Sequence, residues 1–151
     1  MTGVMMADQS RELAERFNRQ MRDVILLLRR VSMDQPITVQ QLAVLGSLQS
    51  GSRRMSELAA EHGVRLPTMT MQINRLVRDG LVTRGADAAD ARVVTVSITP
   101  VGAETLRTAR AQRIDFLADR FAALSEDERA AIATALPAFD KLCADSEESS
   151  R

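Results

Sequence analysis

Residues 56–99 constrain the fold of this chain more than any other segment. Glycines end two short helical patterns there, and two runs rich in β-branched residues then flank a polar loop. The expected elements are a helix over 56–63 that begins at Ser56, a helix over 65–79, and strands over 81–84 and 92–98. This order predicts a helix-turn-helix followed by a two-stranded wing. A helix on such a scaffold has the size and shape to enter a DNA major groove.

The composition predicts a folded protein of one domain. The chain has 151 residues, of which 45% are hydrophobic and 26% are charged, which is enough for a normal core. The longest apolar run, 24–28, is too short to span a bilayer, and the N-terminus lacks a basic start and a long apolar block. We therefore expect neither a membrane segment nor a secretory signal. A single cysteine, Cys143, excludes an internal disulfide framework and favours the reducing cytoplasm.

Charge is unevenly distributed, although the net charge of the whole chain is zero. Residues 53–84 carry six arginines against three acidic residues, a local charge of +3, whereas residues 100–151 carry seven basic and ten acidic residues, a local charge of −3. Arginine suits bidentate contacts to phosphate and guanine, although a bias of 19 arginines among 20 basic residues also follows from genome composition. The basic segment therefore coincides with the predicted helix-turn-helix.

A long amphipathic helix is expected before this segment. It runs from about 8 to 33, and apolar residues recur on its face at three- and four-residue steps, at Leu13, Phe17, Met21, Val24, Leu28 and Val31. Thr38 and Gln41 then form a capping box that begins a second helix. Two helices are therefore expected before the helix-turn-helix.

Two further helices are expected after the wing. Thr99 supplies an N-cap and Pro100 the first helical residue of a long helix. Ser125 and Glu128 form a capping box for a last helix, which Pro137 is expected to bend. The chain is thus predicted to hold six helices, with one small hairpin between the fourth and the fifth.

The terminal helices carry more apolar surface than a small winged core can cover. The simplest way to bury that surface is against a second copy of the chain, so we expect a homodimer. The predicted fold is mainly α with a small β-wing, in a single domain over 1–151. Within it, residues 36–99 form the winged helix-turn-helix, and residues 8–35 and 100–145 form the dimerisation helices.

The helix over 65–79 has two distinct faces on a helical wheel. The face expected to pack on the core holds Leu66, Met69, Ile73, Leu76 and Val77. The opposite face holds Pro67, Met71, Asn74, Arg75 and Arg78, with Thr68, Thr70 and Gln72 at its margins. Hydroxyl, amide and guanidinium groups read base edges, and an exposed methionine suits a thymine methyl. An ordinary solvated helix shows the same pattern, so this helix alone does not decide the function.

The predicted wing adds basic residues beside the reading helix. Arg84 and Arg92 stand near the two ends of its loop, and Asp90 is placed to orient Arg92. An arginine at such a tip is suited to a minor-groove phosphate or base edge. A hairpin loop rarely needs this acid–base pair for stability alone, so the wing favours DNA binding.

Several of these motifs together resemble the MarR family of bacterial winged-helix regulators. The matching motifs are Ser56-Glu57-Leu58-Ala59, Pro67-Thr68-Met69-Thr70, Arg75-Leu76, Gly80-Leu81-Val82, Asp90-Ala91-Arg92 and Ile98-Thr99-Pro100-Val101-Gly102. Met71 and the alanine-rich tip at 88–91 depart from the family's more polar and basic pattern. The resemblance implies a homodimer that binds a pseudo-palindromic operator, commonly as a repressor, and is often released by a small phenolic or other aromatic ligand.

Candidate binding residues follow from the wheel, the wing and the charge distribution. Base contacts in double-stranded DNA are expected from Thr68, Thr70, Met71, Asn74 and Arg75. Phosphate and minor-groove contacts are expected from Arg53, Arg54, Arg65, Arg78 and Arg92, and the interface is completed by Pro67, Arg84 and Asp90. A pocket for a small effector, between the dimer helices and the winged segment, is expected to be lined by Met21, Met33 and Met55.

Other classes of function have weaker support. We find no glycine-rich phosphate loop, no nucleophile with a base and no carboxylate pair, so we expect neither an enzyme nor a cofactor. His62 is the only histidine and is expected to face solvent or the helix dipole, so no metal site is expected. Cys143 is interpreted as a packing residue. The alternative function is a winged-helix protein–protein adaptor without DNA binding, which Met71 favours and Arg75 and Arg78 oppose.

Overall fold

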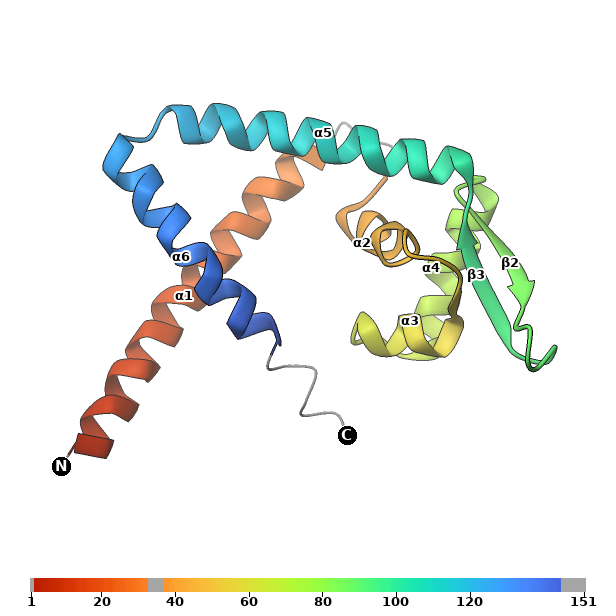
Figure 1. Cartoon of the computed structure of the whole chain (residues 1–151), viewed down its shortest axis with the longest axis horizontal. Coiled ribbons are helices and arrows are strands. Elements are labelled where there is room, and N and C mark those ends of the chain that lie inside the picture. The colour runs from red at the N-terminus through yellow and green to blue at the C-terminus, as the bar shows by residue number, and fades with distance from the viewer. Residues whose placement is uncertain (1, 33–36, 145–151) are drawn as a thin grey trace. The chain divides into compact units, whose positions relative to one another are not determined.

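The computed structural model describes residues 2–32 and 37–144, which are mainly helical with one small sheet (Figure 1). The described residues form six helices, α1 (Thr2–Ser32), α2 (Val39–Ser47), α3 (Met55–Glu61), α4 (Leu66–Arg78), α5 (Pro100–Ala122) and α6 (Glu126–Ala144). The strands are β1 (Arg53–Arg54), β2 (Val82–Ala86) and β3 (Val94–Ile98). The predicted fold class and the order of helices and hairpin are confirmed. Within the described ranges, no helix is both long and apolar enough to cross a membrane.

Internal contacts separate the chain into two compact units, 1–113 and 114–151. The first unit contains the winged helix-turn-helix together with α1 and the first part of α5, and the second contains the rest of α5 and α6. The boundary lies inside α5. The beginning of α5 therefore belongs to the same unit as the wing.

Side-chain caps explain where α2 and α6 begin. The hydroxyl of Thr38 accepts a hydrogen bond from the backbone N–H of Gln41 at 3.2 Å, and the side chain of Gln41 accepts from the N–H of Thr38 at 2.9 Å. Ser125 and Glu128 form the same reciprocal pair at 3.2 and 2.8 Å. Both predicted capping boxes are confirmed, and α6 continues through Pro137 as one helix.

The predicted start of α3 at Ser56 is wrong by one residue. The helix begins at Met55 with Arg54 as its N-cap residue, and the carboxylate of Glu57 accepts from the backbone N–H of Arg54 at 3.2 Å. Ser56 therefore lies inside the first turn. The acid three residues after the cap residue accepts from the backbone N–H of that cap residue, as in one half of a capping box.

The wing belongs to a three-stranded antiparallel sheet of order β1-β3-β2, not to a two-stranded hairpin. In the hairpin, Val82 pairs with Ile98 and Ala86 with Val94. The additional strand, β1, pairs Arg53 with Val96. A two-residue strand is too short to show a period of two, which is why the sequence pattern does not reveal it.

The core of the first unit lies between α2, α3, α4, the sheet and the start of α5. Its fully buried side chains include Val44, Leu45, Leu58, Met69, Ile73, Leu76, Val96 and Leu106. Burying an aliphatic side chain of this size stabilises the fold by about 1.5–3 kcal/mol. Three of these residues come from α4, so the core determines which face of α4 remains open to solvent.

Two residues expected to join this core do not. Leu66 is 49% exposed and Val77 is 38% exposed. Leu66 is the first residue of α4, and its side chain lines a surface groove with Met55 and Val94 rather than the core. Val77 lies about 100° around the helix from Leu76, beyond the buried stripe. The buried stripe of α4 is therefore narrower than predicted.

The start of α5 is attached to the end of α4 by a close backbone approach. The hydroxyl of Thr99 accepts from the N–H of Gly102 at 3.0 Å and donates to the carbonyl of Gly80 at 2.7 Å. The N–H of Thr99 also donates to the carbonyl of Leu81 at 3.0 Å. A Cβ placed on Gly102 would lie 2.0 Å from that carbonyl oxygen. Glycine is therefore required at 102 by space, and the predicted N-cap at Thr99 is confirmed.

Candidate nucleic-acid interface

Helix α4 presents a polar face to solvent because Met69, Ile73 and Leu76 on its opposite face are buried in the core. Exposed residues on this face are Pro67, Thr68, Met71, Asn74, Arg75 and Arg78. Met71 is 51% exposed, as the wheel predicts. The helix ends at Arg78, and the positive φ of 73° at Gly80 together with the bond from the N–H of Leu81 to the carbonyl of Leu76 at 2.9 Å confirms the expected C-terminal turn.

Thr70 differs from the other predicted base contacts on α4. It is half-buried, and its hydroxyl donates to the carbonyl of Leu66 at 2.8 Å. The hydroxyl proton is therefore used inside the helix, and the oxygen of Thr70 is left as an acceptor for a base donor.

Strand β2 contributes an arginine that reaches α4. The guanidinium of Arg84 donates to the side-chain oxygen of Asn74. With its oxygen occupied, Asn74 has its NH2 group available as a donor toward a base acceptor. The contact also links the wing to helix α4.

The predicted pair in the wing loop is confirmed. Nε and one terminal nitrogen of Arg92 donate to the two carboxylate oxygens of Asp90 at 3.1 and 3.2 Å, and the backbone N–H of Arg92 donates to Asp90 at 3.0 Å. These hydrogen bonds hold the pKa of Asp90 below its usual range. The side chain of Arg92 is 91% exposed. Asp90 therefore orients the side chain of Arg92, which is almost fully exposed to solvent.

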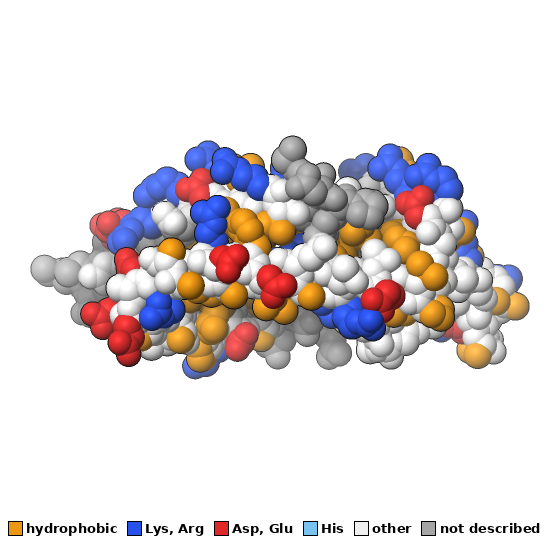
Figure 2. All heavy atoms as spheres, turned by 90° about the horizontal axis from the view of Figure 1, so that it is seen from above, with side chains coloured by type: hydrophobic (Ala, Val, Ile, Leu, Met, Phe, Trp, Pro, Cys, Tyr) orange, Lys and Arg blue, Asp and Glu red, His pale blue; other side chains and the backbone are white. Residues whose placement is uncertain are grey.

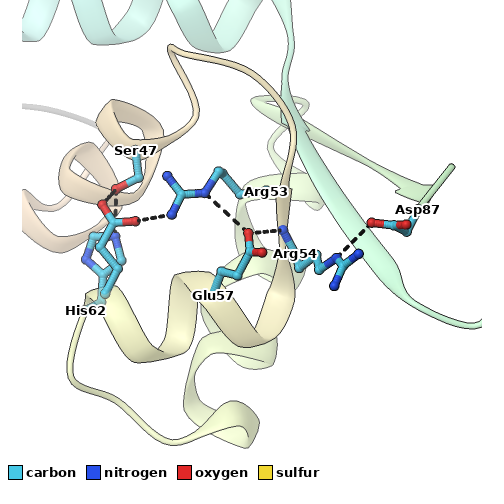
Figure 3. A network of polar contacts seen from close by, with 7 residues as sticks. Ser47, Arg53, Arg54, Glu57, His62 and Asp87 are labelled. Atoms are coloured by element: carbon cyan, nitrogen blue, oxygen red, sulfur yellow. Dashed lines mark hydrogen bonds and ion pairs between the residues drawn. The ribbon is translucent and has the colours of Figure 1, made fainter. Parts of the chain in front are cut away.

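Four of the six arginines of the basic segment fall into two groups, whereas Arg78 pairs with the neighbouring Asp79 at 3.2 Å and Arg84 contacts Asn74. Among the described residues, Arg65 and Arg75 form no ion pair, and both are exposed. By contrast, Arg53 pairs with Glu57 and Glu61 at 3.4 and 3.1 Å, and Arg54 pairs with Asp87 at 2.8 Å (Figure 3). The structure thus places Arg53 and Arg54 in contacts within the protein, which the sequence pattern did not reveal.

With this geometry established, comparisons with known proteins identify its relatives. A model of the MarR family matches residues 35–93. An uncharacterised HTH-type transcriptional regulator of Mycobacterium bovis is 38% identical over 95 residues, which span 62% of this chain and 66% of that protein. The HTH-type transcriptional repressor MdtR of Bacillus subtilis is 33% identical over 62% of this chain and 61% of its own length. The aligned region is thus slightly less than two thirds of each of these relatives.

A solved structure extends the likeness beyond the aligned region. A cysteine-to-serine mutant of MarR from E. coli superposes with a TM-score of 0.76 and 26% identity, covering 84% of this chain and 95% of that one. The chain belongs to the MarR family. Its fold is therefore the winged helix-turn-helix of that family, in which α4 occupies the position of the recognition helix and the β2–β3 hairpin that of the wing.

Of the methionines expected to line an effector pocket in this MarR-family chain, Met21 and Met55 line separate hollows. Met55 lines a groove of about 400 Å³ with Leu66, Thr70 and other residues between α4 and the wing. Met21 lies on α1 in a separate hollow with Phe17 and Ile25. Met33 lies outside the described residues.

His62 and Cys143 occupy places that differ from those expected. His62 does not simply face solvent, because its Nε2 lies 3.0 Å from the hydroxyl of Ser47, which also donates to Glu61 at 2.6 Å. Cys143, interpreted as a packing residue, is exposed on α6. Among the described residues, no group of three His, Cys, Asp or Glu side chains is placed to hold a metal ion.

Acidic residues next to the arginines are the part of the site that sequence analysis did not identify. Asp87 accepts from Arg54 and from two backbone N–H groups of the wing loop, those of Ala89 at 2.9 Å and Asp90 at 3.3 Å. An aspartate that accepts from the N–H two residues later is a typical turn signal. Its ion pair with Arg54 spans 33 residues of sequence, and no local pattern predicts it.

Proposed function

We propose that this chain acts as a homodimer that binds a pseudo-palindromic operator, with one recognition helix in each half-site. The observation that carries the proposal is the exposed face of α4, on which the amide of Asn74 and the unpaired guanidinium of Arg75 stand beside the methyl-bearing Met71. These groups complement the acceptor positions and the thymine methyl of base edges in the major groove. The oriented Arg92 on the wing is then available to the adjacent minor groove.

Exposed apolar side chains support the homodimer. On α1 these are Leu13, Met21, Val24, Ile25 and Leu26; on α5, Ile114 and Phe121; and on α6, Ile132, Leu136, Phe139 and Leu142. Figure 2 shows apolar side chains open on one face of the molecule between charged groups. Large apolar side chains in this number are unusual on helices that meet only water. A second copy of the chain is the partner that closed two-fold symmetry supplies.

Repression in the cytoplasm, relieved by a small aromatic ligand, is the regulatory form of this proposal. The relative MdtR is a transcriptional repressor, and the resemblance to the MarR family implies relief by small phenolic or aromatic compounds. The hollows along α1 and beside Met55 are about 400 Å³ each, which is the size of a small-ligand site. Release of DNA by such a compound would be measured as a fall in operator affinity when the compound is added.

Selection of bound DNA from a random pool by the purified full chain tests the proposal. We expect recovery of an inverted repeat whose half-sites lie about one helical turn apart. In gel shifts on that DNA, Arg75→Ala should weaken binding by about 1–3 kcal/mol, and Arg92→Ala should lower the dependence of log affinity on log salt by about 1. Arg107→Ala, which removes an exposed arginine from α5, serves as the control. Failure to enrich any DNA at low salt would instead favour the protein–protein adaptor.

A further inference from the structure

A network of charged and polar side chains connects the wing to the helix-turn-helix (Figure 3). It begins at Asp87 in the wing loop and passes to Arg54, which stands where β1 meets α3. From there it continues through Glu57 to Arg53 and on to Glu61. The far end is formed by the hydroxyl of Ser47 at the end of α2, which contacts Glu61 and His62. Three elements that are separate in sequence are thereby joined.

The positive and negative charges within this network are nearly balanced. Arg53 and Arg54 are opposed by the three carboxylates of Glu57, Glu61 and Asp87. The two guanidinium groups therefore add no net positive charge to the DNA-binding side. The local charge of +3 for residues 53–84 already subtracts Glu57 and Glu61, and the fold adds Asp87 from outside that segment as a further acidic partner.

Asp87 has the geometry of a brace between the wing and α3. One carboxylate oxygen, Oδ1, accepts from the N–H groups of Ala89 and Asp90 and shapes the turn. The other, Oδ2, accepts from Nε of Arg54 at 2.8 Å. The side chain of Asp87 is only 15% exposed, and the guanidinium holds its pKa below the usual range. A carboxylate in a surface that approaches phosphates is electrostatically unfavourable unless it has such a partner.

We infer that Arg54 and Asp87 are positioning residues, which hold the wing against α3 in the orientation that lets Arg92 reach DNA, and that Arg54 is not itself a phosphate ligand. This inference rests on the proposed operator binding. Ordering a mobile hairpin at the moment of binding lowers affinity, so a wing that is already braced binds more tightly. The role of the pair is therefore to set the position of other side chains.

The two possible roles of Arg54 predict opposite effects of Asp87→Asn. Asparagine keeps the oxygen that shapes the turn but places an NH2 group opposite Arg54, so it breaks the brace without removing the turn. If the pair positions the wing, D87N lowers operator affinity by about fivefold or more, the lower end of typical coupling between sites. If Arg54 binds phosphate, D87N releases its guanidinium and raises the affinity.

A double-mutant cycle with D87N, R54Q and the double variant, measured by fluorescence anisotropy on the selected operator, tests the inference. We expect both single variants to weaken binding and the double variant to be no weaker than either one. The salt slope should change little in R54Q, whereas loss of a phosphate contact would lower it by about 1. The matched controls are R107Q and E104Q, which break an exposed ion pair on α5 and should leave affinity unchanged.

Hydrogen exchange of the wing provides a readout that is independent of DNA. The N–H groups of Asp87 and Val93 donate to the carbonyls of Val93 and Asp90, both at 2.9 Å. D87N should speed their exchange while the amides of α4 keep their protection. Unchanged wing exchange, additive single effects or tighter binding by D87N would each overturn the inference. If the unmodified chain selects no DNA, both the proposed function and this inference fail, whereas selection with an unaffected D87N overturns the inference alone.

Discussion

Gly102→Ala should destabilise the chain although alanine is the better helix former. Gly102 lies in the first turn of α5 and has no positive φ. Its role is spatial, because a Cβ there would stand 2.0 Å from the carbonyl oxygen of Leu81, where real Cβ contacts are not shorter than 3.0 Å. Leu81 and the start of α5 would have to separate by about 1 Å, the difference between these distances. That movement would pull apart the 3.0 Å bond from the N–H of Thr99 to the same carbonyl.

The expected free-energy change follows from three contributions. Overpacking costs about 1–3 kcal/mol, and the disrupted hydrogen bond about 1 kcal/mol. Replacing glycine by alanine in a helix stabilises the folded state by at most about 1 kcal/mol. The net change in the free energy of unfolding is a loss of about 2 kcal/mol. With a urea m-value of about 2 kcal/mol/M, the unfolding midpoint falls by about 1 M.

Gly46→Ala is the matched control because Gly46 lies inside α2 but has a different neighbour. A Cβ there would be 3.1 Å from a terminal nitrogen of Arg110, the movable end of a flexible side chain. The same substitution should therefore be neutral or stabilise by up to about 1 kcal/mol. Urea unfolding at one fixed protein concentration compares the two variants, since self-association would otherwise shift the midpoint. Equal midpoints for G102A and G46A would refute the steric reasoning.

Two further predictions concern single side chains. Thr99→Ala removes the hydroxyl that caps α5 and contacts Gly80, and should lower the free energy of unfolding by about 1 kcal/mol. Thr99→Ser keeps a hydroxyl and should keep most of that stability. Equal losses of stability by the two variants in urea unfolding would contradict the capping role. In an NMR titration, the pKa of the Asp87 carboxyl should lie below its usual value and should rise toward that value in Arg54→Gln. Because the pKa of Asp87 is lowered in the folded state, the contribution of the pair to stability is complete above the ordinary carboxyl pKa and is lost as pH falls through the lowered pKa. An unchanged Asp87 pKa in R54Q would show that Arg54 does not cause the lowering.

Local signals in the sequence were sufficient to predict most of the helices and the exposed polar face of α4. Capping boxes, Pro100 and the glycine at 80 act within a few residues, so Thr38, Ser125 and Thr99 mark helix starts without knowledge of the fold. The spacing of Met69, Ile73 and Leu76 likewise leaves one face of α4 for solvent. The Asp90–Arg92 pair is also local, because its partners are two residues apart.

Tertiary structure decided which arginines of the basic segment form ion pairs within the protein. The sequence alone determined that a basic segment coincides with the recognition helix, and this follows from counting charges along the chain. Whether an individual guanidinium is paired depends on acids that the fold brings to it, such as Asp87, 33 residues after Arg54. The third strand and the steric requirement at Gly102 arise in the same way, from backbone segments that meet only in the folded chain. Short-range periodicity cannot encode such contacts, because the interaction depends on distance in space while the pattern records distance along the chain.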